Sequence, residues 1–119
     1  MTETTFRLNP DPRGMTPSAF MDSDSFTTSD RTEMNLFAYA ADDESILSGV
    51  WEVAPTREDY PDGYPVHEMM HIISGSVILT HPDGSSETFT AGDTFFIPKG
   101  SPCTWETPET MRKFYMIAA

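Results

Sequence analysis

The sequence predicts an all-β protein made of one domain: a double-sheet β-barrel of the jelly-roll kind, preceded by an extended N-terminal arm. From Met34 onward, short runs of β-forming residues alternate with turn residues, and no stretch keeps a 3.6-residue apolar period for three turns. The chain has 119 residues, which is enough for one core and too few for a separate cofactor domain. We therefore expect an arm over residues 1–33 and a barrel over residues 34–119.

The predicted arm is rich in Pro, Ser, Thr and Asp, yet it contains apolar side chains at irregular intervals: Phe6, Leu8, Met15, Phe20, Met21 and Phe26. Disordered tails are usually poor in aromatic residues, because they have no surface on which to bury them. We expect the arm to pack on the barrel or on a partner subunit. A frayed terminus is the alternative for the first dozen residues.

Eight candidate strands follow the arm, at residues 34–40, 46–53, 68–73, 77–81, 86–90, 94–97, 103–106 and 111–117. Eight strands are the number expected of a small double-sheet barrel. Ser74-Gly75-Ser76 predicts a tight hairpin, and Pro82-Asp83-Gly84 predicts a turn whose glycine takes a positive φ. Alternating helices are missing from the pattern, which disfavours a parallel α/β sheet.

The charge and composition exclude several classes of function. Nineteen acidic and seven basic residues give a net charge of −12, which repels nucleic-acid phosphates and anionic membrane surfaces. No secretory signal pattern opens the chain, and no apolar run is long enough to span a membrane. The single cysteine forms no internal disulfide and suits a reducing compartment. We expect a cytoplasmic protein without nucleic-acid or membrane partners.

Two motifs carry a resemblance to a known superfamily. Residues 92–100, Gly-Asp-Thr-Phe-Phe-Ile-Pro-Lys-Gly, resemble the second conserved motif of the cupins, and residues 68–75 resemble the second half of the first motif. Residues 49–55, 59–61 and 103–113 are similar to the single-domain cupin subfamily that includes ureidoglycine aminohydrolase and the ethanolamine-utilisation cupin. The resemblance covers about residues 46–117 and implies a cupin-type barrel.

Metal-binding cupins hold their ion with three histidines and a glutamate, and the resemblance places Glu68 at the glutamate position. Asp62, Tyr64 and Cys103 stand at the three histidine positions. Such a set combines hard carboxylates with a soft thiolate, and both the tyrosine and the cysteine must lose a proton to ligate. We expect no cofactor, while a divalent metal held by Asp62, Tyr64, Glu68 and Cys103 stays open.

The period of two in a strand predicts the lining of the barrel. An inward Glu68 brings Met70 to the same face, and an inward Cys103 brings Trp105. We expect Tyr64, Met70, Cys103 and Trp105 to bind a ligand in a mostly apolar pocket. Desolvation there disfavours the charged form of Glu68, which makes it the candidate catalytic acid or base. The alternative is a structural Glu68 at the barrel mouth, hydrogen-bonded to Tyr64 or to a backbone amide.

Residues 67–71 also read His-Glu-Met-Met-His, which matches the zinc-protease pattern His-Glu-x-x-His. That pattern needs a helix, in which residues four apart share a face. Neighbouring Pro65 and Gly75, with the paired β-branched residues between them, favour a strand instead. On a strand His67 and His71 point away from Glu68, so we predict no protease site. We read Cys103 as a small buried hydrophobe, because no histidine is placed beside it.

Three function classes remain for such a chain. The first is a module that binds a small molecule without chemistry, which we favour. The second is an enzyme acting on a small nitrogenous or carboxylated metabolite, with Glu68 as acid or base. The third is a structural subunit of a larger assembly. Exposed sheet edges and the apolar residues of the arm further predict a homodimer.

Overall fold

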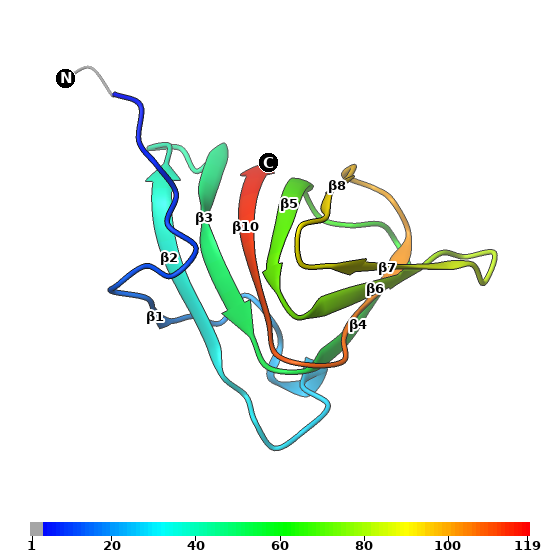
Figure 1. The fold of residues 1–119 in the computed structure, drawn as a ribbon. Coiled ribbons are helices and arrows are strands. Elements are labelled where there is room, and N and C mark those ends of the chain that lie inside the picture. Colours follow the sequence, from blue (N-terminus) through cyan, green and yellow to red (C-terminus); the bar gives the residue numbers. More distant parts are fainter. Residues whose placement is uncertain (1–3) are drawn as a thin grey trace.

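The structure, a computed structural model, describes residues 4–119, and its regular secondary structure is almost entirely antiparallel β-strand (Figure 1). The elements are β1 (Thr16–Pro17), a 3₁₀ turn η1 (Ser23–Ser25), β2 (Glu33–Ala40), β3 (Ile46–Val53), β4 (Thr56–Tyr60), β5 (His67–Ser74), β6 (Ser76–Thr80), β7 (Ser86–Thr90), β8 (Thr94–Ile97), β9 (Cys103–Thr107) and β10 (Met111–Ala118). The predicted all-β class is confirmed. Among the described residues no helix is long and apolar enough to cross a membrane.

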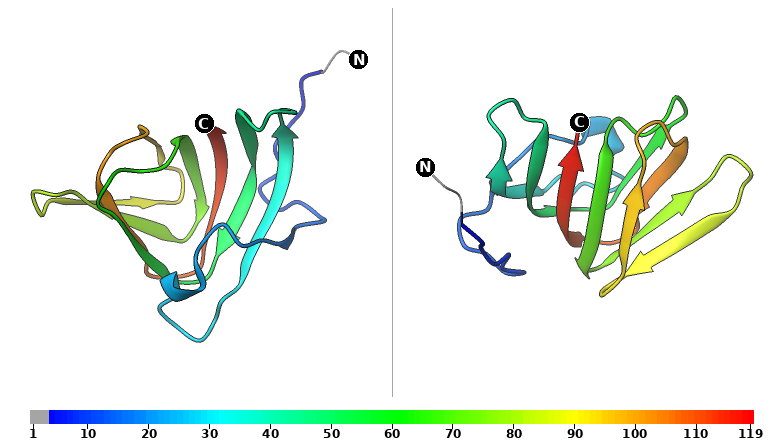
Figure 2. Two further views of the ribbon diagram at one scale, coloured as in Figure 1. Left: turned by 180° about the vertical axis from the view of Figure 1, so that it is seen from behind. Right: turned by 90° about the horizontal axis from the view of Figure 1, so that it is seen from above.

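The strands form two sheets. Six strands make one sheet in the order β1-β2-β3-β10-β5-β8, and four make the other in the order β4-β9-β6-β7. Figure 2 shows β6 and β7 on the opposite side of the molecule from β2. Among residues 4–119 no ladder joins the two sheets edge to edge, so the fold is a jelly roll rather than a closed barrel. Buried side chains from both sheets fill the space between them.

Alternation along each strand decides which residues reach this core. In β5 the side chains of Glu68, Met70 and Ile72 are buried, while the adjacent His67 and Met69 are exposed. In β10 the buried residues are Met111, Lys113 and Tyr115. Successive Cβ atoms of a strand point to opposite faces, so these two sets face the four-stranded sheet.

The sequence did not predict two of the strands, β1 and β4. β4 lies at an edge of the four-stranded sheet, and its outward residues Arg57 and Asp59 make its sequence read as a polar loop. β1 is only two residues long and pairs with β2 at the edge of the larger sheet. An edge strand with charged residues on its solvent face, or one of only two residues, has little apolar signal in the sequence.

The predicted hairpin at Ser74-Gly75-Ser76 is wrong. β5 belongs to the six-stranded sheet and β6 to the four-stranded one, so the chain crosses between sheets at Gly75. Gly75 has φ 78°, and a Cβ there would lie 2.3 Å from the carbonyl oxygen of Thr110. The glycine that suggested a hairpin therefore lies where the chain passes from one sheet to the other in close contact with the Thr110 backbone. The turn predicted around Gly84 is confirmed: it joins β6 to β7, which pair, and Gly84 has φ 88°.

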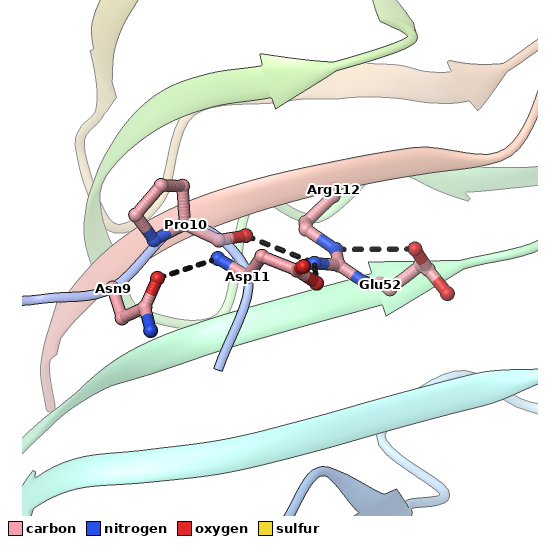
Figure 3. Close-up of polar contacts among 5 residues, drawn as sticks. All are labelled: Asn9, Pro10, Asp11, Glu52 and Arg112. Atoms are coloured by element: carbon pink, nitrogen blue, oxygen red, sulfur yellow. Dashed lines mark hydrogen bonds and ion pairs between the residues drawn. The ribbon is translucent and has the colours of Figure 1, made fainter. Parts of the chain in front are cut away.

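The described part of the arm, from residue 4 onward, makes specific polar contacts with the sheet; residues 1–3 lie outside the described residues. Arg112 on β10 donates to the carbonyl of Pro10 at 2.9 Å and to Asp11 at 3.0 Å, and its Nε donates to Glu52 at 3.2 Å (Figure 3). Further along, the buried Glu33 accepts three hydrogen bonds from the arm: from Ser18 Oγ at 2.6 Å, from the Phe20 amide at 2.8 Å and from the Met21 amide at 2.9 Å.

Candidate functional site: an aromatic cavity with a buried ion pair

A cavity of about 290 Å³ lies between the two sheets. Its wall is mostly aromatic and aliphatic: Phe20, Met21, Phe37, Leu47, Trp51, Tyr60, Tyr64, Pro65, Val66, Glu68, Trp105, Lys113, Tyr115 and Ile117. Phe20 and Met21 come from the arm, so the arm completes the cavity. Phe20 packs edge-on against Phe37, with ring centroids 6.3 Å apart. Of the described residues, Glu68 and Lys113 are the only ones in this wall with a charged side chain.

Glu68 and Lys113 form a buried ion pair. Lys113 Nζ donates to Glu68 Oε2 at 2.6 Å, and the two side chains are only 6% and 5% exposed. The other carboxylate oxygen, Oε1, accepts a hydrogen bond from Tyr64 at 2.7 Å. Charged side chains are almost never fully buried without a partner, and here each is the partner of the other.

Two indole rings enclose the ammonium group of Lys113. Its Nζ lies 4.7 Å from the ring centroid of Trp51 on β3 and 4.8 Å from that of Trp105 on β9. These distances fit cation–π contacts, which contribute about 2 kcal/mol when desolvated. Nζ also lies 3.2 Å from the sulfur of Met70, a weak acceptor. Lys113 thus joins both sheets, since Trp51 and Trp105 belong to different ones.

The turn of the second motif holds Tyr64. The Tyr64 amide donates to the carbonyl of Ser101, and the Gly100 amide donates to the carbonyl of Tyr64, each at 2.8 Å. Gly63 has φ 107° and packs so closely on Gly100 that a Cβ would lie 2.6 Å from its backbone. Burial, with the nearby charge of Glu68, raises the pKa of Tyr64 well above its usual value. The hydroxyl therefore stays protonated and donates to Glu68.

Two further tyrosines in the wall are held protonated by their surroundings. Burial, followed by the charge of Glu58, raises the pKa of Tyr60, whose hydroxyl donates to Glu58 at 3.0 Å. Burial raises the pKa of Tyr115 to about 12, and its hydroxyl donates to Asn35 at 2.7 Å.

The two indole N–H groups differ in their partners. Trp51 Nε1 donates to Glu33 at 3.1 Å, the same carboxylate that holds the arm. Trp105 Nε1 is buried and has no hydrogen-bond partner among the described residues. A buried donor without a partner carries a desolvation cost of about 1–3 kcal/mol. One residue of the cavity wall therefore keeps an unused donor.

The candidate catalytic residue, Glu68, and the four residues predicted to bind a ligand occupy different places. Tyr64, Glu68 and Trp105 line the cavity. Met70 is buried and touches Lys113 through its sulfur. Cys103 lies in the hydrophobic core, and burial raises the pKa of its thiol.

The metal-ligand set suggested by the resemblance does not fit the geometry. Asp62 is exposed and lies outside the cavity wall. The ammonium of Lys113 takes one oxygen of Glu68 and places a positive charge where a cation would bind. The raised pKa values of Tyr64 and Cys103 disfavour the phenolate and thiolate that ligation requires. Among residues 4–119 no cluster of three or more His, Cys, Asp or Glu residues suits a metal ion.

Sequence reasoning missed Lys113 and Glu33. The signal for Lys113 was present, since it lies two residues from both Met111 and Tyr115 and so shares their face on β10. Nothing in the sequence marks Glu33, whose partners lie 12 to 18 residues away. His67 and His71 lie on a strand, as expected, and face away from Glu68. Nδ1 of His67 accepts a hydrogen bond from the Lys99 amide, and Nδ1 of His71 is bonded to Thr94.

Solved structures similar to this chain share its fold. A DUF861-family protein of unknown function from Pseudomonas syringae pv. tomato is 29% identical, with a TM-score of 0.81 over 93% of this chain. Only 46% of that protein is covered, so the present chain spans about half its length. The EutQ protein of Clostridium difficile is 24% identical, with a TM-score of 0.59 over 82% of this chain and 78% of EutQ. A putative EutQ from Salmonella typhimurium is 23% identical, with the same TM-score over 73% of this chain and 69% of that one.

No curated protein matches the chain. The family model of the EutQ-like cupin domain matches residues 40–115, which is more than half of the sequence. The matched residues include Trp51, Glu68, Trp105 and Lys113. The chain belongs to the EutQ-like cupin domain family.

Proposed function

We propose that this protein binds a small molecule in the cavity between its sheets, with an apolar body against the aromatic wall and an uncharged polar head at the Glu68–Lys113 pair. The observation that carries the proposal is the cavity itself: about 290 Å³, walled by aromatic and aliphatic side chains, with one ion pair in its wall. Apolar pockets with a few convergent polar groups are the usual form of a ligand site. The volume corresponds to roughly ten water-sized groups, and therefore to a small ligand.

The ion pair supports an uncharged head group. Glu68 and Lys113 neutralise each other, so a bound carboxylate or ammonium would leave one buried charge without a counterion. Such a charge costs several kcal/mol in a low-dielectric site. An alcohol or an amide instead accepts from Lys113, donates to Glu68 and adds no charge.

The catalytic alternative uses the same residues. Both oxygens of Glu68 already accept hydrogen bonds, one from Lys113 and one from Tyr64. A base role for Glu68 also requires transfer of a proton to a carboxylate that is paired with Lys113, whereas binding needs only a free lone pair on one of its oxygens. Binding is for that reason the function we put forward.

The two tryptophans of the chain both line the cavity, which makes their fluorescence a direct probe of occupancy. We would titrate four molecules with one body and different heads: 4-phenylbutan-1-ol, 4-phenylbutanamide, 4-phenylbutanoate and 4-phenylbutylamine. We expect saturable changes in emission with the alcohol and the amide, and at least tenfold weaker binding of the two charged molecules, by the cost of an unpaired buried charge.

Matched variants at neighbouring positions of β10 locate the site. Ile117 lines the cavity, whereas Met116 beside it is exposed on the other face. Ile117→Phe fills the cavity and should weaken binding of the alcohol at least tenfold, while Met116→Phe should leave it unchanged. If none of the four molecules alters tryptophan emission at millimolar concentration, the proposed function is wrong.

A further inference from the structure

The amine of Lys113 is a nucleophile that the proposed binding function uses only as a hydrogen-bond donor. The chain has two lysines, and their surroundings are opposite. Lys99 is exposed in the turn after β8, whereas the side chain of Lys113 is 6% exposed and lines the cavity. A lysine desolvated in an apolar pocket is one of the settings in which proteins use an amine to attack a carbonyl group. Lys113 therefore places a nucleophile inside a ligand cavity.

Strand register explains how the amine of Lys113 reaches the wall that holds Glu68. Lys113 on β10 lies opposite Ile72 of β5, whereas Glu68 lies opposite Ile117. The two strands run side by side (Figure 1). The lysine side chain therefore extends along the sheet, past the sulfur of Met70, to the carboxylate.

The contacts of Nζ leave one of its N–H groups without an acceptor. A lysine ammonium has three N–H groups. Glu68 Oε2 at 2.6 Å and the sulfur of Met70 at 3.2 Å accept two of them, and no third acceptor lies among residues 4–119. A carbonyl oxygen in the cavity can accept from the third, which brings the carbonyl carbon next to the nitrogen.

We propose that Lys113 captures aldehydes as a reversible imine, so that the ligand of the cavity is an aldehyde with an apolar body. This inference rests on the proposed function, in which an uncharged head group meets the Glu68–Lys113 pair. An aldehyde is such a head group, and its carbonyl oxygen is the acceptor that the remaining N–H lacks.

The proton transfers of imine formation balance within the ion pair. Nζ passes one proton along the 2.6 Å contact to Glu68 Oε2, which leaves a neutral amine and a neutral acid in an apolar wall. The amine attacks the carbonyl carbon, a C–N bond forms, and a second proton moves from nitrogen to the carbonyl oxygen to give a carbinolamine. Glu68 then gives its proton to that hydroxyl, the C–O bond breaks, and water leaves.

The product restores the charges of the ligand-free site. The iminium nitrogen of Lys113 carries one positive charge, and Glu68 is again a carboxylate beside it. The indole rings of Trp51 and Trp105, whose centroids lie 4.7 and 4.8 Å from Nζ, still face a cation. Capture therefore replaces a carbonyl group by a water molecule and leaves no buried charge without a partner.

The same two indole rings favour aldehydes over ketones. Both rings lie close to Nζ, so little room remains around a carbon atom bonded to it. An aldehyde carbon carries a hydrogen where a ketone carbon carries a second alkyl group. We therefore assign the site to aldehydes.

Reductive trapping on the full chain tests this assignment. Cyanoborohydride converts an imine of 4-phenylbutanal into a stable secondary amine, and peptide mapping by mass spectrometry shows which lysine carries it. Lys99 is the internal control, because it is exposed and lies outside the cavity wall. We expect at least about tenfold more label on Lys113 than on Lys99, because the cavity holds the aldehyde against the amine. After unfolding in urea, the two lysines should be labelled alike.

A matched ketone and two matched variants sharpen the test. The methyl ketone with the same body, 5-phenylpentan-2-one, should lower the ratio of Lys113 to Lys99 label at least about tenfold, since the ratio cancels the lower reactivity of ketones. Ile117→Phe fills the cavity and should reduce labelling of Lys113 to the level of Lys99, whereas Met116→Phe on the other face should leave it unchanged.

The outcomes separate this inference from the proposed function. If 4-phenylbutan-1-ol binds but 4-phenylbutanal labels Lys113 no more than Lys99, the inference is wrong and the proposed function stands. If none of the four titrated molecules binds and Lys113 is not preferred, both are wrong. A ketone that labels Lys113 with the same preference as the aldehyde overturns the assignment to aldehydes.

Discussion

Lys113 and Glu68 show what a single buried contact contributes to this protein. Removing two charges from water costs several kcal/mol for each, and their mutual attraction compensates only when the geometry is close and the remaining donors and acceptors are satisfied. Here the contact is 2.6 Å, Tyr64 occupies the second carboxylate oxygen, and two indoles face the ammonium. The pair holds its position because every alternative leaves a charge exposed to an apolar wall.

Removing one charge of this pair should lower the stability of the fold strongly, whereas removing both charges should lower it little. We expect Lys113→Met and Glu68→Gln each to lower the free energy of unfolding by about 3–5 kcal/mol, since each leaves one buried charge unpaired. The double variant Lys113→Met/Glu68→Gln should recover most of that loss. Urea denaturation followed by tryptophan fluorescence measures all three.

An exposed ion pair supplies the control for this cycle. Arg57 and Asp59 are 3.8 Å apart and more than half exposed, so Arg57→Ala should change stability by less than about 1 kcal/mol. Losses from Lys113→Met and Glu68→Gln that simply add in the double variant would contradict a coupled pair.

At the scale of elements, the connection between β5 and β6 decides the architecture. Gly75 lies where the chain leaves one sheet for the other, against the backbone that leads into β10. Gly84, in the β6–β7 turn, has a similar positive φ but open space around the position of a Cβ. Gly84 is thus required only by its backbone conformation, whereas Gly75 is required both by its conformation and by close packing.

Alanine at these two positions should have different effects. Gly84→Ala meets only the left-handed backbone and should cost about 1 kcal/mol. Gly75→Ala adds a contact of 2.3 Å to the Thr110 carbonyl and should cost roughly 3 kcal/mol or more. Thermal and urea denaturation of both variants measure the difference, and equal effects would show that the crossing is not tightly packed.

The arm both binds to the six-stranded sheet and lines the cavity. Its backbone amides at Phe20 and Met21 bind Glu33, and the side chains of the same two residues line the cavity. Glu33 also holds Trp51, one of the two indoles around Lys113. One carboxylate therefore links the position of the arm to the position of the site.

For the molecule as a whole, burial of ionisable groups predicts loss of stability at alkaline pH. The pKa values of Tyr60, Tyr64 and Tyr115 are raised from 10, chiefly by burial, and that of the Cys103 thiol from 9 by burial as well. Above these ordinary values the unfolded chain loses protons that the folded chain keeps. The slope of stability against pH is then negative.

We therefore expect the free energy of unfolding to decline from about pH 9, where the thiol begins to ionise in the unfolded chain, and more steeply from pH 10 to 12. The stabilisation that Tyr115 gives by staying protonated should be fully present below pH 10 and lost by about pH 12. Urea denaturation at intervals of half a pH unit measures the slope, and Tyr115→Phe should reduce it. A flat profile between pH 10 and 11.5 would contradict this account.

The sequence predicted much of this fold because its signals are local. Six strands begin or end at the predicted residues. The period of two and the turn residues predicted these bounds, as well as the inward position of Glu68 and the strand conformation of residues 67–71. The failures have a common cause. The crossing at Gly75 uses the same residues as a hairpin, and β4 reads as a polar loop, because the sheet that a strand joins is decided by residues distant in the chain.

By itself, then, the sequence determined the class of the fold, the family and the inward position of Glu68, Met70 and Trp105, since all three depend on neighbours along the chain. Only the tertiary structure decided that Lys113 meets Glu68, 45 residues earlier, that indoles from two sheets enclose it, and that the arm completes the cavity. The metal set implied by the resemblance fails for the same reason. Alternation places a side chain inside the fold, but the distance to its partner depends on how the two sheets pack.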